Sequence, residues 1–203
     1  MKIIAVGMNY AAHNKELHHT LEQREPVIFM KGDAVLKDGK PFFIPDFSSE
    51  VHYETELVVK ISRLGKHIAE QFAHRYYGEV TVGIDFTARD LQTQLRNRGL
   101  PWEISKAFDG AAVAGKFLPL STAGDIRRLA FRLDVNGQTV QAGNTCDMIF
   151  SVDEIVAYAS RFFTLRMGDL IYTGTPAGVG AVRIGDRLQG YLGDSRLLDF
   201  YVR

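Results

Sequence analysis

The chain has 203 residues, of which 46% are apolar and 24% charged, and its 24 basic residues balance its 24 acidic ones. This length suits a single domain over residues 1–203 that buries about 70% of the surface of the unfolded chain, and the apolar content excludes intrinsic disorder. An even charge balance argues against a nucleic-acid binder, which needs excess positive charge to replace counterions on phosphate. Cys146 is the only cysteine, so neither an intramolecular disulfide nor a Cys-based zinc site can form.

The first apolar run is short. It is interrupted from Asn9 onward by His13 and Asn14, too early for a signal peptide or a membrane span. We therefore expect a cytoplasmic protein that contacts no membrane.

The N-terminal half predicts strands joined by short connections. Strands are expected over 2–6 and 26–31, with a helix over 10–17 between them. Lys37-Asp38-Gly39-Lys40 is typical of a hairpin turn before a strand over 41–44. Residues 51–62 alternate as one continuous strand, and apolar residues at four-residue spacing predict a helix over 68–77.

The second half continues this pattern. A strand over 79–85 is followed by Thr87 to Asp90, which is typical of a capping box that opens a helix. Asn136-Gly137 is a strong hairpin signal between strands over 129–135 and 138–142. A second capping box, Ser151 to Glu154, opens a helix expected to turn Phe162 inward, and strands separated by Gly-Asp turns fill the tail. Strands outnumber helices without regular alternation, which favours a mostly β, α+β fold and disfavours Rossmann and barrel folds.

Three carboxylates stand out against this background. On one strand, Glu54 and Glu56 share a face about 7 Å apart and repel each other unless a cation lies between them. Asp85 ends an apolar strand just before the helix at 87. Together they form a hard oxygen site that suits Mg²⁺ or Mn²⁺. The alternative is a solvated strand face for the glutamates and a turn role for Asp85.

Other candidate residues lie in three further segments. His13 and Glu16 can meet on one helical turn, where the carboxylate would make the imidazole a base for water; an ordinary surface pair is the alternative. Lys106 lies in an apolar stretch unusual for a surface lysine, although its stem could lie along the surface. The small residues of the glycine-rich loop over 173–180 let backbone N–H groups and the Thr175 hydroxyl approach an anionic substrate; a tight turn between strands is the alternative.

Seven blocks, in order and at matching spacing, resemble the fumarylacetoacetate hydrolase family, in particular its short acylpyruvase-type members. The blocks are Val6-Gly7-Met8-Asn9-Tyr10-Ala11-Ala12-His13 with Glu16, Phe29-Met30-Lys31, Tyr53-Glu54-Thr55-Glu56-Leu57, Gly83-Ile84-Asp85-Phe86-Thr87-Ala88-Arg89-Asp90-Leu91-Gln92, Lys106-Ala107-Phe108-Asp109, Asp147-Met148-Ile149-Phe150 and Gly168-Asp169-Leu170-Ile171-Tyr172-Thr173-Gly174-Thr175-Pro176-Ala177-Gly178-Val179-Gly180.

The resemblance implies a mixed, rolled β-sheet of the type found in the family's C-terminal domain, assembled as a homodimer. It assigns Mg²⁺ or Mn²⁺ to Glu54, Glu56 and Asp85, and no organic cofactor. It makes His13, Glu16 and Lys106 catalytic, and it places Gln92, Gly174 and Thr175 against the substrate. One departure concerns the substrate: many acylpyruvase-type members carry an arginine where this chain has Met8.

The activity implied is metal-dependent hydrolysis of a C–C bond in 3-acylpyruvate-like β-diketo acids, a class of small 2-oxo acids, through a metal-stabilised pyruvate enolate. An alternative uses the same enolate for oxaloacetate decarboxylation or tautomerisation, or for isomerisation and decarboxylation of a 2-hydroxydienedioate from aromatic degradation. A third is a non-catalytic, metal-dependent binding protein.

Overall fold

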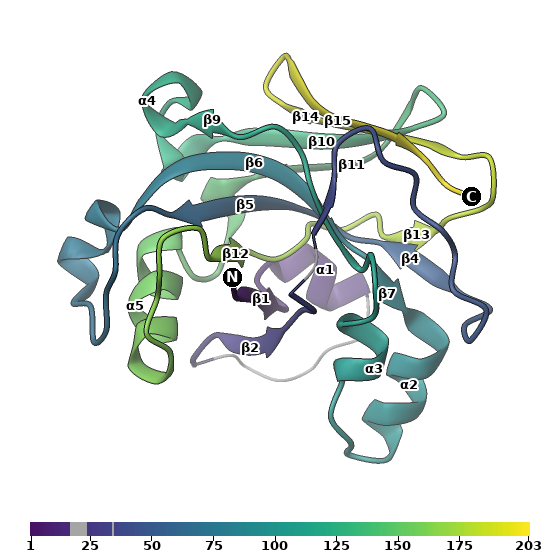
Figure 1. Cartoon of the computed structure of the whole chain (residues 1–203), viewed down its shortest axis with the longest axis horizontal. Coiled ribbons are helices and arrows are strands. Elements are labelled where there is room, and N and C mark those ends of the chain that lie inside the picture. Colours follow the sequence, from purple (N-terminus) through teal and green to yellow (C-terminus); the bar gives the residue numbers. More distant parts are fainter. Residues whose placement is uncertain (17–23, 34) are drawn as a thin grey trace.

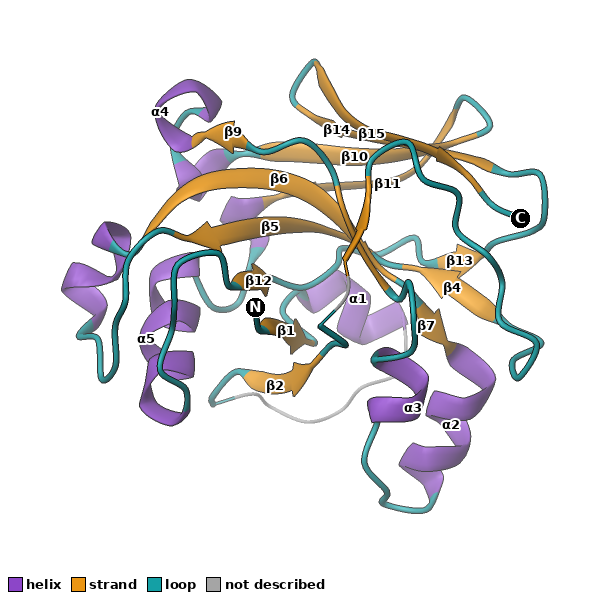
Figure 2. Ribbon diagram, viewed as in Figure 1, coloured by secondary structure: helices purple, strands orange, loops and turns teal. Residues whose placement is uncertain are grey.

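The computed structural model describes residues 1–16, 24–33 and 35–203. Strands dominate these residues, as Figures 1 and 2 show. The strands are β1 (Ile3–Gly7), β2 (Val27–Met30), β3 (Val35–Lys37), β4 (Val51–Tyr53), β5 (Thr55–Ile61), β6 (Tyr77–Asp85), β7 (Thr87–Ala88), β8 (Ala112–Ala114), β9 (Leu118–Pro119), β10 (Ala130–Val135), β11 (Gln138–Asn144), β12 (Leu170–Tyr172), β13 (Gly180–Ala181), β14 (Arg187–Leu192) and β15 (Ser195–Tyr201). The α-helices are α1 (Ala11–Glu16), α2 (Arg89–Asn97), α3 (Glu103–Lys106), α4 (Leu120–Ala123) and α5 (Val152–Phe162), and Glu70–Arg75, Ile126–Arg128 and Thr145–Asp147 form 3₁₀ turns.

The largest sheet pairs β1, near the N-terminus, with β12, which lies far along the sequence. Its order is β2-β1-β12-β5-β6-β8-β3, with β9 paired to β6. The β1–β12 and β3–β8 pairs are parallel and the other pairs antiparallel, so the sheet is mixed. Figure 1 shows β5 and β6 curving beneath a second sheet of order β11-β10-β14-β15. The predicted α+β, mostly β fold with a rolled mixed sheet is confirmed.

Apolar side chains fill the space between these layers. One buried cluster joins Leu57 and Val82 of the large sheet to Phe131 of the second sheet and to Ile155 of α5. Ile155 and Ala159 are buried as expected, but Phe162 is 54% exposed, so the predicted inward orientation of this residue is wrong.

The continuous strand predicted over 51–62 is interrupted at Glu54. β4 pairs with β7 and β13 in a small third sheet, whereas β5 belongs to the large sheet. At the break, the Glu54 carbonyl accepts a hydrogen bond from the Asp85 backbone N–H at 2.8 Å. The break therefore fixes two of the candidate ligands relative to each other.

Four other local predictions differ, wholly or in part, from the structure. The segment over 68–77 forms only the 3₁₀ turn Glu70–Arg75, with Phe72 exposed, and within 41–44 only Phe42 makes a bridge, which is parallel to Val202. The turn expected at 37–40 is present, with the Lys40 N–H donating to the Lys37 carbonyl at 3.1 Å, but it does not connect a hairpin, since β3 pairs in parallel with β8. Thr87 caps no helix: α2 has no side-chain cap, and the Thr87 hydroxyl donates to the Asp85 carbonyl at 3.3 Å.

Two local signals are confirmed. Asn136 and Gly137, with φ of 53° and 80°, connect β10 and β11 as an antiparallel hairpin. Ser151 and Glu154 form the capping box of α5. The helix expected over 10–17 is present as α1, and residue 17 lies outside the described residues. Among the described residues, none of the helices has the length and apolar character needed to cross a membrane.

Candidate active site

The three candidate metal ligands converge at one buried point. Each of Glu54, Glu56 and Asp85 offers a carboxylate oxygen, and these oxygens lie within 4.8 Å of one another. Glu54 occupies the break between β4 and β5, Glu56 lies on β5 opposite Gly83, and Asp85 ends β6. All three are at least 95% buried. A buried set of three carboxylates fits a divalent cation that prefers oxygen ligands.

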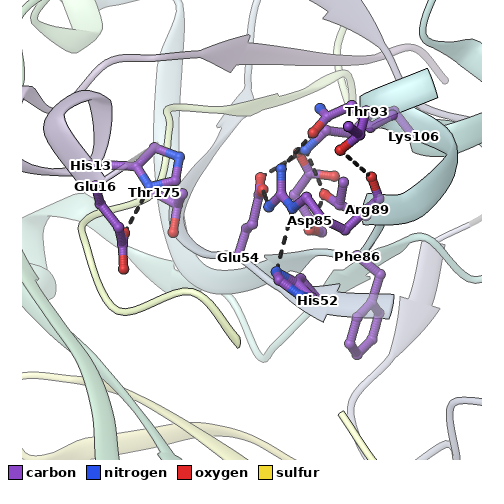
Figure 3. Close-up of polar contacts among 12 residues, drawn as sticks. His13, Glu16, His52, Glu54, Asp85, Phe86, Arg89, Thr93, Lys106 and Thr175 are labelled. Carbon is purple, nitrogen blue, oxygen red and sulfur yellow. Dashed lines mark hydrogen bonds and ion pairs between the residues drawn. The ribbon is translucent and has the colours of Figure 1, made fainter. Parts of the chain in front are cut away.

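Basic side chains surround these carboxylates (Figure 3). The Lys106 ammonium donates to Glu54 at 2.7 Å and to Asp85 at 2.8 Å, and also to the Thr87 hydroxyl at 2.6 Å. Arg89 forms an ion pair with Glu54. The chain therefore balances the charge of its own carboxylates with cations from separate elements.

Lys31 completes the set of buried cations. It forms an ion pair with Asp85 and donates to the Phe86 carbonyl at 3.1 Å. Each carboxylate thus has a distinct electrostatic environment: Asp85 contacts two lysines and Glu54 contacts Lys106 and Arg89, while Glu56 accepts a backbone N–H from Gly174 at 2.6 Å.

The pKa values follow these environments. Burial works to raise the pKa of Glu54, but the charges of Lys106 and Arg89 hold it well below its ordinary value. Burial and the nearby charge of Asp85 raise the pKa of Glu56 well above its ordinary value. For Lys106, the carboxylates of Asp85 and Glu54 outweigh burial and raise its pKa, so its ammonium stays charged.

His13 faces the carboxylates from α1, and Glu16 of the same helix contacts it from the side away from the cavity. His13 is 95% buried, and its Nδ1 lies 3.3 Å from the Glu16 carboxylate, as the dashed contact in Figure 3 shows. Glu16 in turn accepts the backbone N–H of Gly178 at 3.1 Å and 3.2 Å, which ties α1 to the glycine-rich loop. Burial lowers the pKa of His13 despite the opposing charges of Glu54 and Glu16, so the neutral imidazole, which can accept a proton, is favoured.

Gly174 differs from the expectation that it lies against the substrate. Its N–H is directed at Glu56 rather than at open space, so Gly174 positions a candidate ligand. The Thr175 hydroxyl, in contrast, lines the site cavity and accepts from the Gln141 amide at 2.9 Å. Gln92 also lines the cavity, and its side-chain oxygen accepts from Arg89.

The cavity itself contains nearly all of the predicted site residues. It is lined by Val6, Gly7, Met8, His13, Phe29, Glu54, Glu56, Asp85, Arg89, Gln92, Arg96, Trp102, Lys106 and Thr175. Two of the candidates do not line the cavity: Glu16 contacts His13, and Gly174 donates its N–H to Glu56. Met8 adopts the left-handed conformation, with φ of 62°, and presents an apolar group to the cavity.

Sequence reasoning missed several contributors. Arg89 pairs with Glu54, 35 residues away, while the carboxylate of its neighbour Asp90 accepts from Ser48 and Ser49. Lys31 lies 54 residues from its partner Asp85, and Gln141 lies 34 residues from Thr175. No local pattern marks these partners, although Lys31 and Arg89 stand within the blocks that carried the family resemblance.

Comparison with known proteins agrees with this site. The family described as "Fumarylacetoacetate (FAA) hydrolase C-terminal" matches residues 2–197. The oxaloacetate tautomerases of Rattus norvegicus mitochondria and of Escherichia coli are 40% and 39% identical to this chain, over 92% of it and over 85% and 86% of their own lengths. A crystal structure of fumarylpyruvate hydrolase from Pseudomonas aeruginosa in complex with Mn²⁺ and pyruvate matches with a TM-score of 0.92 at 39% identity, covering 100% of this chain and 89% of that one.

The chain belongs to the fumarylacetoacetate hydrolase family, a family of enzymes. Relatives within it are named as tautomerases, hydrolases and isomerases, including a 2-hydroxyhepta-2,4-diene-1,7-dioate isomerase from Mycobacterium marinum that is 34% identical.

Proposed function

We propose that this chain is a hydrolase that cleaves the bond between C3 and C4 of a 2,4-dioxo acid and depends on Mg²⁺ or Mn²⁺. The observation that carries the proposal is the buried His13, which lines the same cavity as the carboxylate cluster and is contacted by the exposed Glu16. Glu54, Glu56 and Asp85 would hold the metal. When bound, the metal supplies Lewis acidity that polarises the carboxylate and 2-oxo oxygens of the substrate.

The side chains of the cavity divide the remaining tasks. Lys106 neutralises negative charge beside the reacting head group, and Thr175 and Gln92 offer polar contacts to the substrate. The neutral His13 imidazole takes a proton from water as the water oxygen attacks C4. The C3–C4 bond then breaks, its electron pair passes to C3 and the 2-oxo oxygen, and protonation at C3 yields pyruvate plus a carboxylic acid.

Glu16 is a positioning residue for this base. Its contact with Nδ1 fixes the imidazole tautomer and orientation, and its bonds to Gly178 hold α1 against the loop. The orientation of the His13 imidazole, which accepts the proton, therefore depends on both α1 and the glycine-rich loop.

A second candidate activity is keto–enol tautomerisation of oxaloacetate. It is favoured by the relatives named oxaloacetate tautomerase, which cover 92% of this chain. Tautomerisation moves a proton at C3 without attack by water, and the same cavity offers His13 for that transfer. The proposals differ in bond cleavage, so products separate them.

The test compares acetylpyruvate with oxaloacetate, first with EDTA and then with added Mg²⁺ or Mn²⁺. Metal-dependent loss of the diketone absorbance with release of pyruvate supports the hydrolase, whereas turnover of oxaloacetate alone supports the tautomerase. His13→Ala should lower kcat for hydrolysis by about 10²–10⁴-fold. His74→Ala, a change at an exposed histidine of the Glu70–Arg75 turn, is the matched control. Hydrolysis at the wild-type rate by His13→Ala would show that His13 is not the base.

The expected homodimer stays a prediction, for which light scattering of the purified protein is the direct measurement.

A further inference from the structure

One part of the wall of the site cavity is apolar. It is formed by Met8 together with the aromatic rings of Phe29 and Trp102. The two rings meet edge to face with centroids 6.0 Å apart, and the nearest atoms of both lie within 4 Å of the position that a Cβ on Gly7 would take. Because Gly7 directly precedes Met8, the three side chains gather around one short stretch of backbone.

This apolar wall begins beside the carboxylate cluster. The Lys106 ammonium contacts both Glu54 and Asp85. The same ammonium lies 5.1 Å from the centroid of the Phe29 ring, against which Trp102 packs. A ligand whose carboxylate and 2-oxo oxygens bind at the carboxylate cluster therefore has an apolar surface next to it for the rest of its chain.

The backbone of Met8 is held in a conformation that methionine does not favour. Its φ of 62° lies in the left-handed region, which is unfavourable for a residue with a Cβ. The carbonyl of Met8 accepts from the Asn14 side-chain amide at 2.9 Å, and the buried Asn9 that follows bonds the carbonyls of Phe150 and Thr173. Such conformations persist where the surroundings fix them, and they cluster at functional sites. The fold thus directs this thioether to the cavity at a cost to the backbone.

The apolar lining continues outside the cavity. Phe29 and Trp102 also line a surface groove between β2, the end of α5 and the connection from α2 to α3. Figure 1 shows β2 lying between α5 and the α2–α3 pair. Leu100 and Phe162 add exposed apolar side chains to this groove, and Glu103, which also lines it, is acidic. The groove therefore favours an apolar chain and disfavours a second carboxylate.

We propose that Met8, Phe29 and Trp102 form a subsite for the distal chain of the substrate, and that the enzyme prefers 2-oxo acids with an apolar chain to 2-oxo acids that end in a second carboxylate. In the proposed hydrolysis this chain is the part of the acyl group beyond C4. The inference rests on the proposed function, because the head group must bind at the carboxylate cluster for the chain to reach the subsite. Oxaloacetate, for which two relatives are named, is a dicarboxylate, so this preference separates the chain from them.

Arg96 lines the same cavity, but it already interacts within the chain. The comparison of an apolar chain with a carboxylate of equal length therefore decides between the two kinds of substrate.

The test measures binding, so that it does not depend on which reaction the enzyme performs. Calorimetry on the Mn²⁺-loaded protein gives the Kd of pyruvate, 2-oxobutanoate, 2-oxohexanoate and 2-oxoadipate, none of which has a 4-oxo group that would permit C3–C4 cleavage. We expect the Kd to fall by about two- to fourfold for each added methylene, the size expected of burying that group. 2-Oxoadipate should bind about fivefold or more weakly than 2-oxohexanoate, because its terminal carboxylate would lose water against an apolar wall.

Fluorescence then locates the chain in the molecule. Trp102 is the only tryptophan, so its emission reports on this subsite alone. With the Mg²⁺-loaded protein, saturating 2-oxohexanoate should shift the emission to shorter wavelength, because the chain excludes water from the indole, whereas saturating pyruvate should leave it nearly unchanged. The same emission with both acids would place the chain elsewhere and overturn the inference.

Substitutions assign the preference to Met8. Met8→Gln keeps the length of the side chain but makes it polar, so the gain per methylene should fall towards one while the Kd of pyruvate stays the same. Met8→Leu, which restores an apolar group, should recover most of the gain. Met167→Gln is the matched control: Met167 is 74% exposed and lines neither the cavity nor the groove, so this variant should keep the wild-type series.

Failure of this inference differs from failure of the proposed function. A Kd that does not change with chain length, tighter binding of 2-oxoadipate than of 2-oxohexanoate, or an equal weakening of pyruvate and 2-oxohexanoate in Met8→Gln would overturn the subsite even if dioxo acids are hydrolysed. A gain per methylene that depends on Met8 would support the subsite even if no dioxo acid were turned over. If none of the four acids binds the Mn²⁺-loaded protein, the head-group site is wrong and this inference falls with it.

Discussion

Gly174 offers a sharp test of how the glycine-rich loop supports the carboxylate cluster. Its φ of 101° lies in the region that L side chains rarely adopt, and a Cβ there would approach the Cβ of Asn9 to 2.7 Å. Asn9 has little freedom to move away, because its side chain bonds the carbonyls of Phe150 and Thr173 at 3.0 Å and 2.8 Å. Gly174→Ala therefore imposes two separate costs.

The two costs have different sizes. The left-handed backbone conformation costs about 1–2 kcal/mol for a residue with a Cβ. Overpacking against an immobile neighbour adds about 1–3 kcal/mol. Gly174→Ala should therefore lower the free energy of unfolding by about 2–5 kcal/mol.

Gly168→Ala separates the two costs. Gly168 has a φ of 86°, but nothing lies within 4 Å of the position of its Cβ. This control should lose only the backbone part, about 1–2 kcal/mol. Urea unfolding of both variants without metal gives the comparison, and equal losses would refute the close contact with Asn9.

The loop substitution should also affect metal binding. Gly174 donates its N–H to Glu56 at 2.6 Å, so a shift of the loop moves a ligand. Loss of such a supporting contact typically costs about 10–100-fold in metal affinity. A Mn²⁺ titration followed by calorimetry should show this loss for Gly174→Ala and wild-type affinity for Gly168→Ala. Unchanged affinity in Gly174→Ala would mean that Glu56 does not depend on the loop or is not a ligand.

Two further predictions concern stability away from the cavity. Asp169 is buried and accepts from the backbone N–H groups of Lys2 and Arg166 at 2.7 Å and 2.8 Å, as well as from the Lys2 ammonium. Asp169→Asn should therefore lower the free energy of unfolding by about 2–3 kcal/mol at pH 7. These bonds outweigh burial and lower the pKa of Asp169, so its contribution is complete above about pH 4 and is lost as the pH falls through the folded-state pKa. Urea unfolding over a pH series should show the variant and the wild type converging in acid, and a pH-independent difference would contradict this. Gly137→Ala, in the hairpin turn at φ 80°, should cost about 1–2 kcal/mol with unchanged kcat, and an unaltered unfolding midpoint would show that the turn tolerates a side chain.

The fold class could be predicted because its determinants are local. Alternating strands, the Asn136-Gly137 turn and the Ser151–Glu154 capping box each act within a few residues, and each is present in the structure. The errors fall where a distant partner overrides the local pattern. The segment at 87 to 90 has the sequence of a capping box, but Thr87 pairs with His52 across β7 and β4 and turns its hydroxyl to Asp85 and Lys106.

The residues of the candidate site also include some that could be predicted from the sequence and some that could not. The carboxylates could be selected from the sequence because acidic residues are conspicuous among apolar strand residues. Arg89, which lies beside these carboxylates, could not be selected from the sequence. Its orientation depends on three contacts, two with residues distant in the sequence and one with a residue on the next turn of its own helix. Arg89 donates to His52 at 3.3 Å and also contacts Glu54 and Gln92. Two of these contacts exist only once β4 has paired with β7.

Glu54 shows why the expected repulsion between the two glutamates does not expose this segment to solvent. On an unbroken strand their carboxylates would project in parallel about 7 Å apart. The chain instead leaves the strand at Glu54, and oxygens of both glutamates and of Asp85 come within 4.8 Å of one another in the interior. Cations from α2, α3 and the segment after β2 then contact Glu54 and Asp85, while Glu56 accepts one backbone N–H. Because Glu56 is the carboxylate without a contacting cation among the described residues, it has the greatest electrostatic gain from a bound metal.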